Sequence, residues 1–254
     1  MTSLTLAALP AAALLMLVHV ATPSLRFLDG APRSAWLSIA GGVAVAYVFV
    51  HLLPELAAGE ARIRQMVAGA DFGERHVYLV ALFGLATFYG LDRLAKTSRT
   101  KRQGAFVGGG RDAEAAGAGI GPAVFWVHMG SFAIYNALVG YLLLHREVTG
   151  LGALAFFTVA MALHFVVSDY GLNDDHRAPY RRVGRWVLVA AVLAGFLLGA
   201  ATEVSAAAIT MLTAFLGGGV ILNVLKEEVP SERQSRFWAF ALGMAGYAAL
   251  LLTL

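Results

Sequence analysis

The sequence contains no cysteine, so disulfide bonds and thiolate metal sites are both excluded. Any metal would have to bind to histidine, carboxylate, amide or hydroxyl groups. Charged residues are also scarce, since they make up 14% of the chain whereas hydrophobic residues make up 59%. The mean hydropathy of +0.70 is too high for a soluble domain with a solvated surface. The composition therefore predicts an integral membrane protein.

Two further absences narrow the function. The sequence has no Gly-rich ATP-binding motif, so transport of a solute would follow a gradient or be coupled to an ion. The net charge of +3 does not indicate nucleic-acid binding, because the basic run at 99–102 is accompanied by Phe106 alone and lacks interleaved aromatic residues. We expect residues 96–121 to form a flexible cytoplasmic loop beside anionic lipid.

Eight apolar segments are long enough, or nearly so, to cross the roughly 30 Å hydrocarbon core of a bilayer. They cover residues 4–22, 35–53, 77–91, 122–144, 151–167, 186–202, 206–225 and 237–254. The first segment has no basic region before it and no clear cleavage site after it, so we expect a retained helix rather than a signal peptide. The predicted fold is a single all-α membrane domain with eight transmembrane helices.

The basic residues are divided unevenly between the loops on the two sides of these segments. If the N-terminus lies outside, the outer loops contain only Arg62, Arg64, Arg75 and Arg146 of the 19 lysines and arginines. The remaining basic residues then lie in the inner loops, as the positive-inside rule requires. We therefore expect an integral protein of a bacterial inner (plasma) membrane with both termini outside.

Two of the apolar segments share a pattern of glycine and proline. Residues 41–54 align without gaps on residues 217–230, and both stretches begin with two glycines and end with proline. The same alignment places His51 opposite Glu227. The two segments would cross the membrane in opposite directions, which predicts an inverted repeat, the usual plan of secondary transporters.

Polar side chains interrupt the fourth and fifth apolar segments, where contact with hydrocarbon favours none. They are His128, Ser131, Tyr135 and Asn136 in the fourth segment, and His164, Ser168 and Asp169 in the fifth. An ionisable group inside a membrane is costly, so it usually faces the bundle interior, a partner or a water-filled path. We therefore expect the hairpin at 121–175 to be the centre of the molecule.

Helical spacing places these polar side chains on two faces. The first face carries His128, Ser131 and Tyr135, and the second carries His164 and Ser168, with Asp169 beside it. If the two faces meet, the histidines and Asp169 would bind a divalent metal such as Zn, Mn, Fe, Co or Ni, or would pass protons. The alternative is a hydrogen-bond network that only holds the helices together.

Polar groups also lie near the ends of these segments. His51 and Glu55, four residues apart at the outer end of the second segment, would form either a vestibule for the cation or an interfacial hydrogen bond. At the inner end of the fifth segment, Asp174, Asp175 and His176 would form a cytoplasmic exit for the cation. The alternative for these three residues is an ordinary solvated turn.

Two more ionisable side chains lie near the inner ends of other segments. Glu227, at the end of the seventh segment, would belong to the transport pathway. Lys226 beside it would either neutralise its charge or reach the lipid headgroups. His19, in the first segment, is expected to be a packed or interfacial histidine.

Three helix ends share the features of one known family. The second segment ends in His-Leu-Leu-Pro-Glu at 51–55, and the seventh, at 219–230, is similar to a glycine-rich family span that closes in acidic-x-x-Pro, here Glu227 to Pro230. The third segment, at 81–93, ends in an acidic-basic pair. Together with the long loop after the third segment, these features resemble the ZIP (Zrt/Irt-like) family of divalent metal transporters over most of the chain.

The resemblance implies a metal site in the fourth and fifth segments that is retained only in part. The family pattern His-x-x-x-Asp-Gly-x-x-x-Gly falls on Ser131, Tyr135, Asn136 and Gly140. The pattern His-Glu-x-Pro-His-Glu-x-Gly falls on 164–171, where His164 and Gly171 remain and Asp169 is a shorter carboxylate. The resemblance also implies an inverted repeat of helices 1–3 and 6–8 around a central hairpin of helices 4 and 5.

The expected function is a ZIP-like permease for a divalent cation or a related small solute, with a degraded metal site, no resident cofactor and no enzymatic activity. The first alternative is a non-transporting protein of the same fold, such as a sensor or an assembly partner. An intramembrane zinc hydrolase is less favoured, because it needs about three protein ligands and the histidines are scattered. Glycines such as Gly84, Gly90, Gly195 and Gly199 permit close packing within one chain or in a homodimer.

Overall fold

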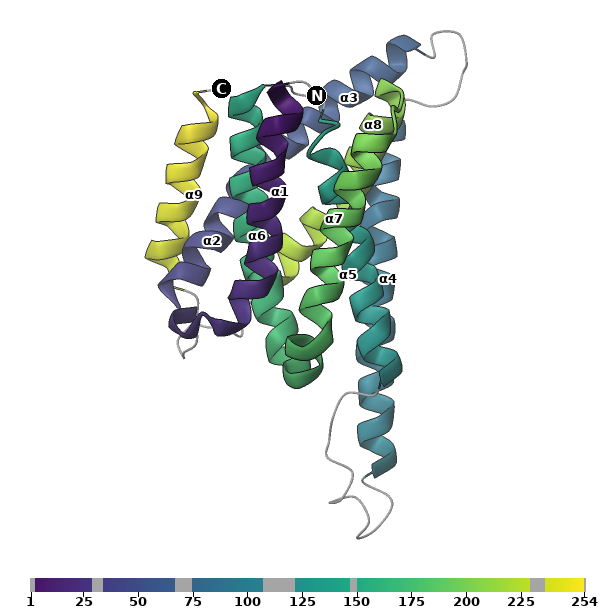
Figure 1. The fold of residues 1–254 in the computed structure, drawn as a ribbon, viewed down its shortest axis with the longest axis vertical. Helices are drawn as coiled ribbons and strands as arrows, with labels where there is room; N and C mark the ends of the chain where they lie inside the picture. Colours follow the sequence, from purple (N-terminus) through teal and green to yellow (C-terminus); the bar gives the residue numbers. More distant parts are fainter. Residues whose placement is uncertain are drawn as a thin grey trace.

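The computed structural model describes residues 3–28, 34–66, 75–106, 122–146, 150–228 and 236–253. In this part of the chain all regular secondary structure is helical, and no strand occurs. The α-helices are α1 (Ser3–Ala21), α2 (Ala35–Tyr47), α3 (Leu53–Met66), α4 (His76–Phe106), α5 (Pro122–Leu142), α6 (Leu151–Pro179), α7 (Arg185–Ala201), α8 (Ala206–Asn223) and α9 (Phe237–Leu251). They form one bundle (Figure 1).

Shorter helical elements connect or interrupt these helices. They are the 3₁₀ turns η1 (Thr22–Ser24) and η2 (Arg26–Leu28), and the π-helical turns η3 (Val48–Leu52), η4 (Tyr180–Gly184) and η5 (Val224–Glu228). The turn η3 joins α2 to α3 without a break in the helix, and η5 extends α8 in the same way. Between α6 and α7 the chain reverses at Arg177, whose φ of 38° and ψ of −105° are non-helical.

Several helical segments are long and apolar enough to cross a membrane. They are Leu6–Ser24, Ala35–Gln65, Leu151–Ala201, which contains both α6 and α7, and Ala206–Lys226. Large apolar side chains also cover the outside of the bundle, among them Leu82, Phe83, Trp126, Leu197 and Trp238, each more than half exposed. An apolar exterior of this extent is typical of contact with lipid.

The helices occupy the segments predicted from hydropathy, but some extend further than expected. α4 continues to Phe106, so the first part of the predicted loop at 96–121 is helical, and residues 107–121 lie outside the described residues. Residues 96–103 contain neither glycine nor proline, and lysine, arginine and glutamine favour helix. α6 continues from the predicted end at 167 to Pro179, because polar side chains of its second half are bonded inside the bundle.

The closest helix pairs are α2 with α9, α4 with α8, and α5 with α7. Glycines let the backbones of these pairs meet, as in many membrane helix pairs. A Cβ atom at Gly42 would lie 2.1 Å from the carbonyl oxygen of Phe240 on α9, and one at Gly218 would lie 1.9 Å from that of Ala81 on α4. No side chain larger than hydrogen fits at either position.

The two aligned glycine-rich segments have the same backbone irregularity in the same register. The alignment of 41–54 on 217–230 superposes η3 on η5 and Gly42 on Gly218. The two helices run in opposite directions, because α2 begins at the end of the bundle where α1 ends, and α8 begins at the end where α7 ends (Figure 1). The partner of α2 is α9 and that of α8 is α4, so the equivalence includes the neighbouring helices.

The two ends of the bundle differ in charge. α1 begins and α9 ends at the same end (Figure 1), which we call the terminal end; Arg75 and Arg146 lie there. We call the opposite end the basic end, because it includes the lower part of α4 and the turn between α6 and α7. The basic side chains placed there include Arg93, Arg177, Arg181, Arg182, Arg185 and Lys226.

Candidate functional site

A buried histidine on α1 joins the two central helices. The Nδ1 atom of His19 lies 2.8 Å from Oδ2 of Asp169 on α6, and its Nε2 atom lies 2.8 Å from Oδ1 of Asn136 on α5. The side chains of His19 and Asp169 are each 1% exposed. This contact is therefore shielded from water and connects α1, α5 and α6 at one point.

The hydrogen-bond pattern determines where the protons of this contact lie. The side-chain amide of Asn136 donates to the carbonyl oxygen of Phe132 at 2.7 Å, so the Oδ1 atom of Asn136 faces His19 and accepts from Nε2–H. The bond between Nδ1 and Asp169 then contains a single proton shared by the imidazole and the carboxylate. The pair is neutral overall in either protonation form, which is what a buried site requires.

The sequence analysis did not identify His19 as a site residue. Its prediction of a packed histidine describes the burial but misses the bonds to Asp169 and Asn136. An ionisable side chain inside an apolar segment usually faces a partner. This expectation, which was used for His128 and His164, applied equally to His19. The partners lie 117 and 150 positions away in the sequence, so no local pattern indicates them.

A second polar network lies nearer the basic end. Oδ1 of Asp92 on α4 lies 2.9 Å from Nζ of Lys226 in η5 and 3.3 Å from Nε2 of His128 on α5. Nδ1 of His128 lies 2.9 Å from Nε2 of His176 on α6. Because an ionised carboxylate only accepts hydrogen bonds, the Nε2–H group of His128 donates to Asp92.

This network stands at the edge of a pocket of about 320 Å³ between α4, α5 and the end of α8. We call it the inner pocket; its polar lining comprises Asp92, His128, Ser131, Tyr135, Asn223 and Lys226. The prediction that His128, Ser131 and Tyr135 share one helix face is confirmed, since all three line it. Ser131 uses its hydroxyl to donate to the carbonyl oxygen of His128 at 2.8 Å.

The three residues of the predicted cytoplasmic exit do not lie on the same side of α6. His176 is buried and bonded to His128, whereas Asp174 is exposed and Asp175 half-buried. The three residues therefore do not form one surface cluster. The alternative prediction of a solvated turn is also wrong, because residues 173–176 belong to α6. The side chain of Glu227, the remaining pathway residue near this end, lies outside the described part of the structure.

The predicted metal ligands His128, His164 and Asp169 are not brought together. Among the described residues, no three His, Asp or Glu side chains are placed to hold a metal ion. His128 and Asp169 are engaged by other partners, and His164 contacts Ser168 at a long 3.5 Å. The reason is helical phase, since positions 164 and 169 are five residues apart and project about 140° apart on α6.

The two predicted polar faces do meet, although not as a metal site. The rings of Tyr135 on α5 and His164 on α6 lie 5.7 Å apart. The Oη atom of Tyr135 and the Nδ1 atom of His164 are buried and have no hydrogen-bond partner among the described residues. Buried polar atoms without partners are rare and usually indicate water, an ion or a ligand nearby.

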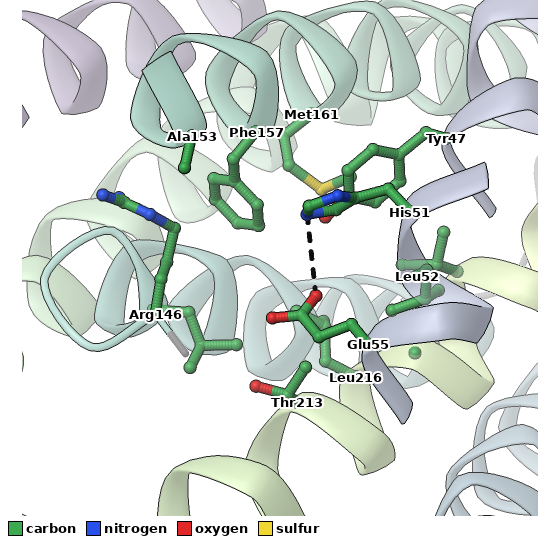
Figure 2. A pocket seen from close by; sticks show the side chains of 13 residues that line it. Tyr47, His51, Leu52, Glu55, Arg146, Ala153, Phe157, Met161, Thr213 and Leu216 are labelled. Carbon is green, nitrogen blue, oxygen red and sulfur yellow. Dashed lines mark ion pairs between the residues drawn. The ribbon is translucent and has the colours of Figure 1, made fainter. Parts of the chain in front are cut away.

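A second pocket lies toward the terminal end, between η3, α3, the end of α5, the first part of α6 and the stretch 213–220 of α8. We call it the outer pocket; it has a volume of about 490 Å³. Its lining is Tyr47, His51, Leu52, Glu55, Leu142, Arg146, Ala153, Phe157, Met161, Thr213, Leu216, Gly217 and Val220. Figure 2 shows His51 and Glu55 on one side and Arg146 on the other.

The predicted vestibule pair, His51 and Glu55, faces this pocket. Nε2 of His51 lies 3.8 Å from Oε2 of Glu55, too far for a hydrogen bond, so the interfacial hydrogen bond predicted as the alternative is not formed. His51 lies in η3, and π-helical turns occur frequently at functional sites. The pair therefore keeps hydrogen-bonding capacity for something that enters the pocket.

Arg146 is a pocket residue that the sequence analysis counted only as an outer-loop cation. Its Nη1 donates to the carbonyl oxygen of Leu143 at 2.6 Å, which anchors the side chain at the end of α5. Its Nε is buried without a hydrogen-bond partner in the described residues. The one feature of the sequence that could have indicated a pocket residue is the position of Arg146 just after an apolar segment.

Comparison with models of known protein families gave no match, and a search of curated proteins gave none either.

Proposed function

We propose that the chain is a secondary permease of ZIP-like plan, which moves a divalent cation or a related small solute by alternating access. The observation that carries the proposal is the pair of antiparallel helices, α2 with η3 and α8 with η5. They share a close-packed glycine and a π-helical turn at aligned positions. Antiparallel repeats around a central helix pair are the usual plan of proteins that open alternately to either side of a membrane.

The positions of the two pockets support this proposal. Along α8, Gly217 and Val220 line the outer pocket, whereas Leu222 and Asn223 line the inner pocket. α5 behaves in the same way, with residues near its end facing the outer pocket and Tyr135 facing the inner one. Both helices thus border both pockets, which lie toward opposite ends of the bundle.

The charge difference between the ends supports one orientation. Basic residues favour the cytoplasmic side, so the basic end would face the cytoplasm and the terminal end the outside of a bacterial plasma membrane. In that orientation the outer pocket is the entry side. The Asp92–Lys226 ion pair and the hydrogen bond that His128 donates to Asp92 join α4, η5 and α5 beside the inner pocket.

One observation favours the non-transporting alternative. His19 occupies Asp169 and Asn136 with its own two ring nitrogens, so these two polar groups already have a partner within the chain. A permanent contact of this kind would suit a sensor or an assembly partner. A permease would have to break it or pass beside it in each cycle.

Cysteine labelling tests the proposal without knowledge of the solute, because the natural chain contains no cysteine. Thr213→Cys probes the outer pocket, Asn223→Cys probes the inner pocket, and Leu197→Cys, on the exposed surface of α7, is the matched control. We expect a membrane-impermeant maleimide to label Thr213→Cys from the terminal side and Asn223→Cys from the basic side.

Uptake into proteoliposomes completes the test. Zn, Mn, Fe, Co and Ni, followed by small organic solutes, would be offered to the wild type and to Asp169→Ala. The proposal requires that a solute which is taken up also protects one cysteine and exposes the other. If Asn223→Cys reacts under no condition and no solute enters, the permease assignment is wrong and the non-transporting protein is favoured.

A further inference from the structure

Side chains of opposite charge, Glu55 and Arg146, line the outer pocket, where they attract each other. Glu55 and Arg146 face the same space (Figure 2), and no ion pair joins them within the described residues. The acidic group is 3.8 Å from His51, and the guanidinium is held by the carbonyl oxygen of Leu143. The hydrogen bond to Leu143 anchors the Arg146 side chain, and both charged side chains line the pocket.

The Arg146 side of the pocket suits a carboxylate. A guanidinium has five N–H donors in a planar fork that matches the two oxygens of a carboxylate. The bond to Leu143 uses one of them, and the buried Nε atom has no partner among the described residues. A bound carboxylate would satisfy such donors through charge-assisted hydrogen bonds.

The Glu55 side suits an ammonium group. The carboxylate of Glu55 accepts no short hydrogen bond from His51, since 3.8 Å separates the two groups. The Glu55 side chain is 11% exposed, so water can donate hydrogen bonds to only part of its carboxylate. An ammonium donates three hydrogen bonds, and the hydroxyl of Thr213 on the same wall is a further acceptor.

The rest of the lining is apolar and leaves room for a side group. Leu142, Phe157, Met161, Leu216 and Val220 form the remaining walls. Small-molecule sites are usually apolar with a few placed polar groups, and the lining of this pocket has that composition. A bare ion of either sign would be attracted by one of the two charged side chains and repelled by the other, whereas a zwitterion presents an opposite charge to each.

We propose that the outer pocket binds a small zwitterion of the amino-acid class. Its carboxylate contacts Arg146, its ammonium contacts Glu55 and His51, and its apolar side group packs against Phe157 and Met161. This inference names the solute class for the proposed permease and rests on that function only for the transport step. Binding itself is independent of transport.

The test is a binding titration of the purified full-length protein in detergent, by calorimetry and thermal shift. The probes are alanine, leucine and phenylalanine, which cover three side-group sizes. Leucine methyl ester lacks the carboxylate, 4-methylpentanoate lacks the ammonium, and Zn²⁺ represents a bare cation. We expect at least one of the three amino acids to bind, and both leucine analogues to bind at least about tenfold more weakly than leucine, as the loss of one charge-assisted contact implies.

Three variants assign the contacts. Arg146→Gln should abolish the preference for leucine over its methyl ester, and Glu55→Gln should abolish the preference for leucine over 4-methylpentanoate. Arg64→Gln, an exposed arginine at the same end that does not line the pocket, should change neither preference. The inference is overturned if none of the three amino acids binds, or if Zn²⁺ binds in their place and Arg146→Gln strengthens that binding.

The outcome separates this inference from the proposed function. Amino-acid binding without uptake of the same radiolabelled compound would support the pocket assignment and contradict the permease. Uptake of a metal without amino-acid binding would support the permease and contradict the pocket assignment. Binding and uptake that are both lost in Arg146→Gln would support the two together.

Discussion

The helices α2 with η3 and α8 with η5 share a backbone plan but end in opposite electrostatic surroundings. Both have a glycine against a neighbouring backbone and a π-helical turn in the same register. Beside η3, however, Glu55 and Arg146 line a pocket with no ion pair between them among the described residues, whereas in η5 Lys226 is paired with Asp92 at 2.9 Å. The repeat determines packing, and the individual side chains determine which end is able to accept a ligand.

Because of this difference, we expect substitutions at the two ends of the bundle to have different effects. Paired charges at the basic end hold helices together, so changing them should reduce stability. In the described residues the only ion-pair contact of the outer-pocket charges is the long 3.8 Å contact between His51 and Glu55, so changing them should affect binding and leave stability nearly unaltered. Substitution of the equivalent glycines Gly42 and Gly218, in contrast, should reduce stability to a similar extent in both repeats.

The largest effect is expected at the equivalent glycines. Gly42→Leu and Gly218→Leu place a side chain within 2.1 and 1.9 Å of backbone oxygens, which cannot move aside without separating the helices. We expect each to cost more than about 3 kcal/mol or to abolish folding, measured by thermal unfolding and monodispersity in detergent. Gly90→Leu is the control, because no atom lies within 4 Å of that position. Tolerance in only one repeat would show that the two are not equivalent.

The next largest effect is expected at the His19–Asp169 contact. Asp169→Ala leaves the buried imidazole without its partner, which typically costs about 3–5 kcal/mol. The double variant His19→Leu with Asp169→Leu should recover most of this loss, because an apolar replacement of a buried pair is often neutral. Thermal unfolding of the single and double variants measures both values. A double variant no more stable than Asp169→Ala would mean that the contact does not act as a pair.

A smaller loss is expected for the ion pair beside the inner pocket. Asp92→Asn keeps the shape and one acceptor but removes the charge bonded to Lys226. We expect a loss of about 1–3 kcal/mol in unfolding free energy, the usual range for a hydrogen bond to a charged group. If the same variant also increases labelling of Asn223→Cys, the pair acts as the closure of the inner pocket. Unchanged stability would contradict the contribution of the ion pair to folding, and unchanged labelling would contradict its role in closing the inner pocket.

The smallest effect on stability is expected in the outer pocket. Glu55→Gln removes a charge whose nearest ion-pair partner is 3.8 Å away, so unfolding free energy should change by no more than about 0.5 kcal/mol. The measurement is the same thermal unfolding, compared directly with Asp92→Asn. Equal losses in the two variants would remove the contrast between the ends.

Much of the helical plan follows from local sequence. Long apolar runs are expected to be helical in a membrane, and the helices of the structure occupy those runs. The face shared by His128, Ser131 and Tyr135 follows from helical spacing and is confirmed by the inner pocket. The pair of His51 and Glu55 at one site is likewise a consequence of a spacing of four residues.

The errors arise where a prediction depended on partners from distant helices. Asp169 bonds to His19 rather than joining a metal site with His164, because the two positions on α6 point in different directions. His176 turns inward to His128, although its neighbours in the sequence are acidic and polar. The resemblance to a family cannot correct such errors, since a motif states which residues occur and not how a changed set is oriented.

By itself the sequence determined that the chain is apolar, helical and internally repeated, because each of these properties depends on composition or on spacing along a single helix. Only the tertiary structure decided which polar groups are paired and which remain available. Pairing depends on the relative rotation and depth of helices that lie far apart in the chain, and that geometry leaves no local signature. Arg146 shows the difference, since its sequence position suggested a loop and the packing of α5, α6 and α8 placed it on the wall of a pocket.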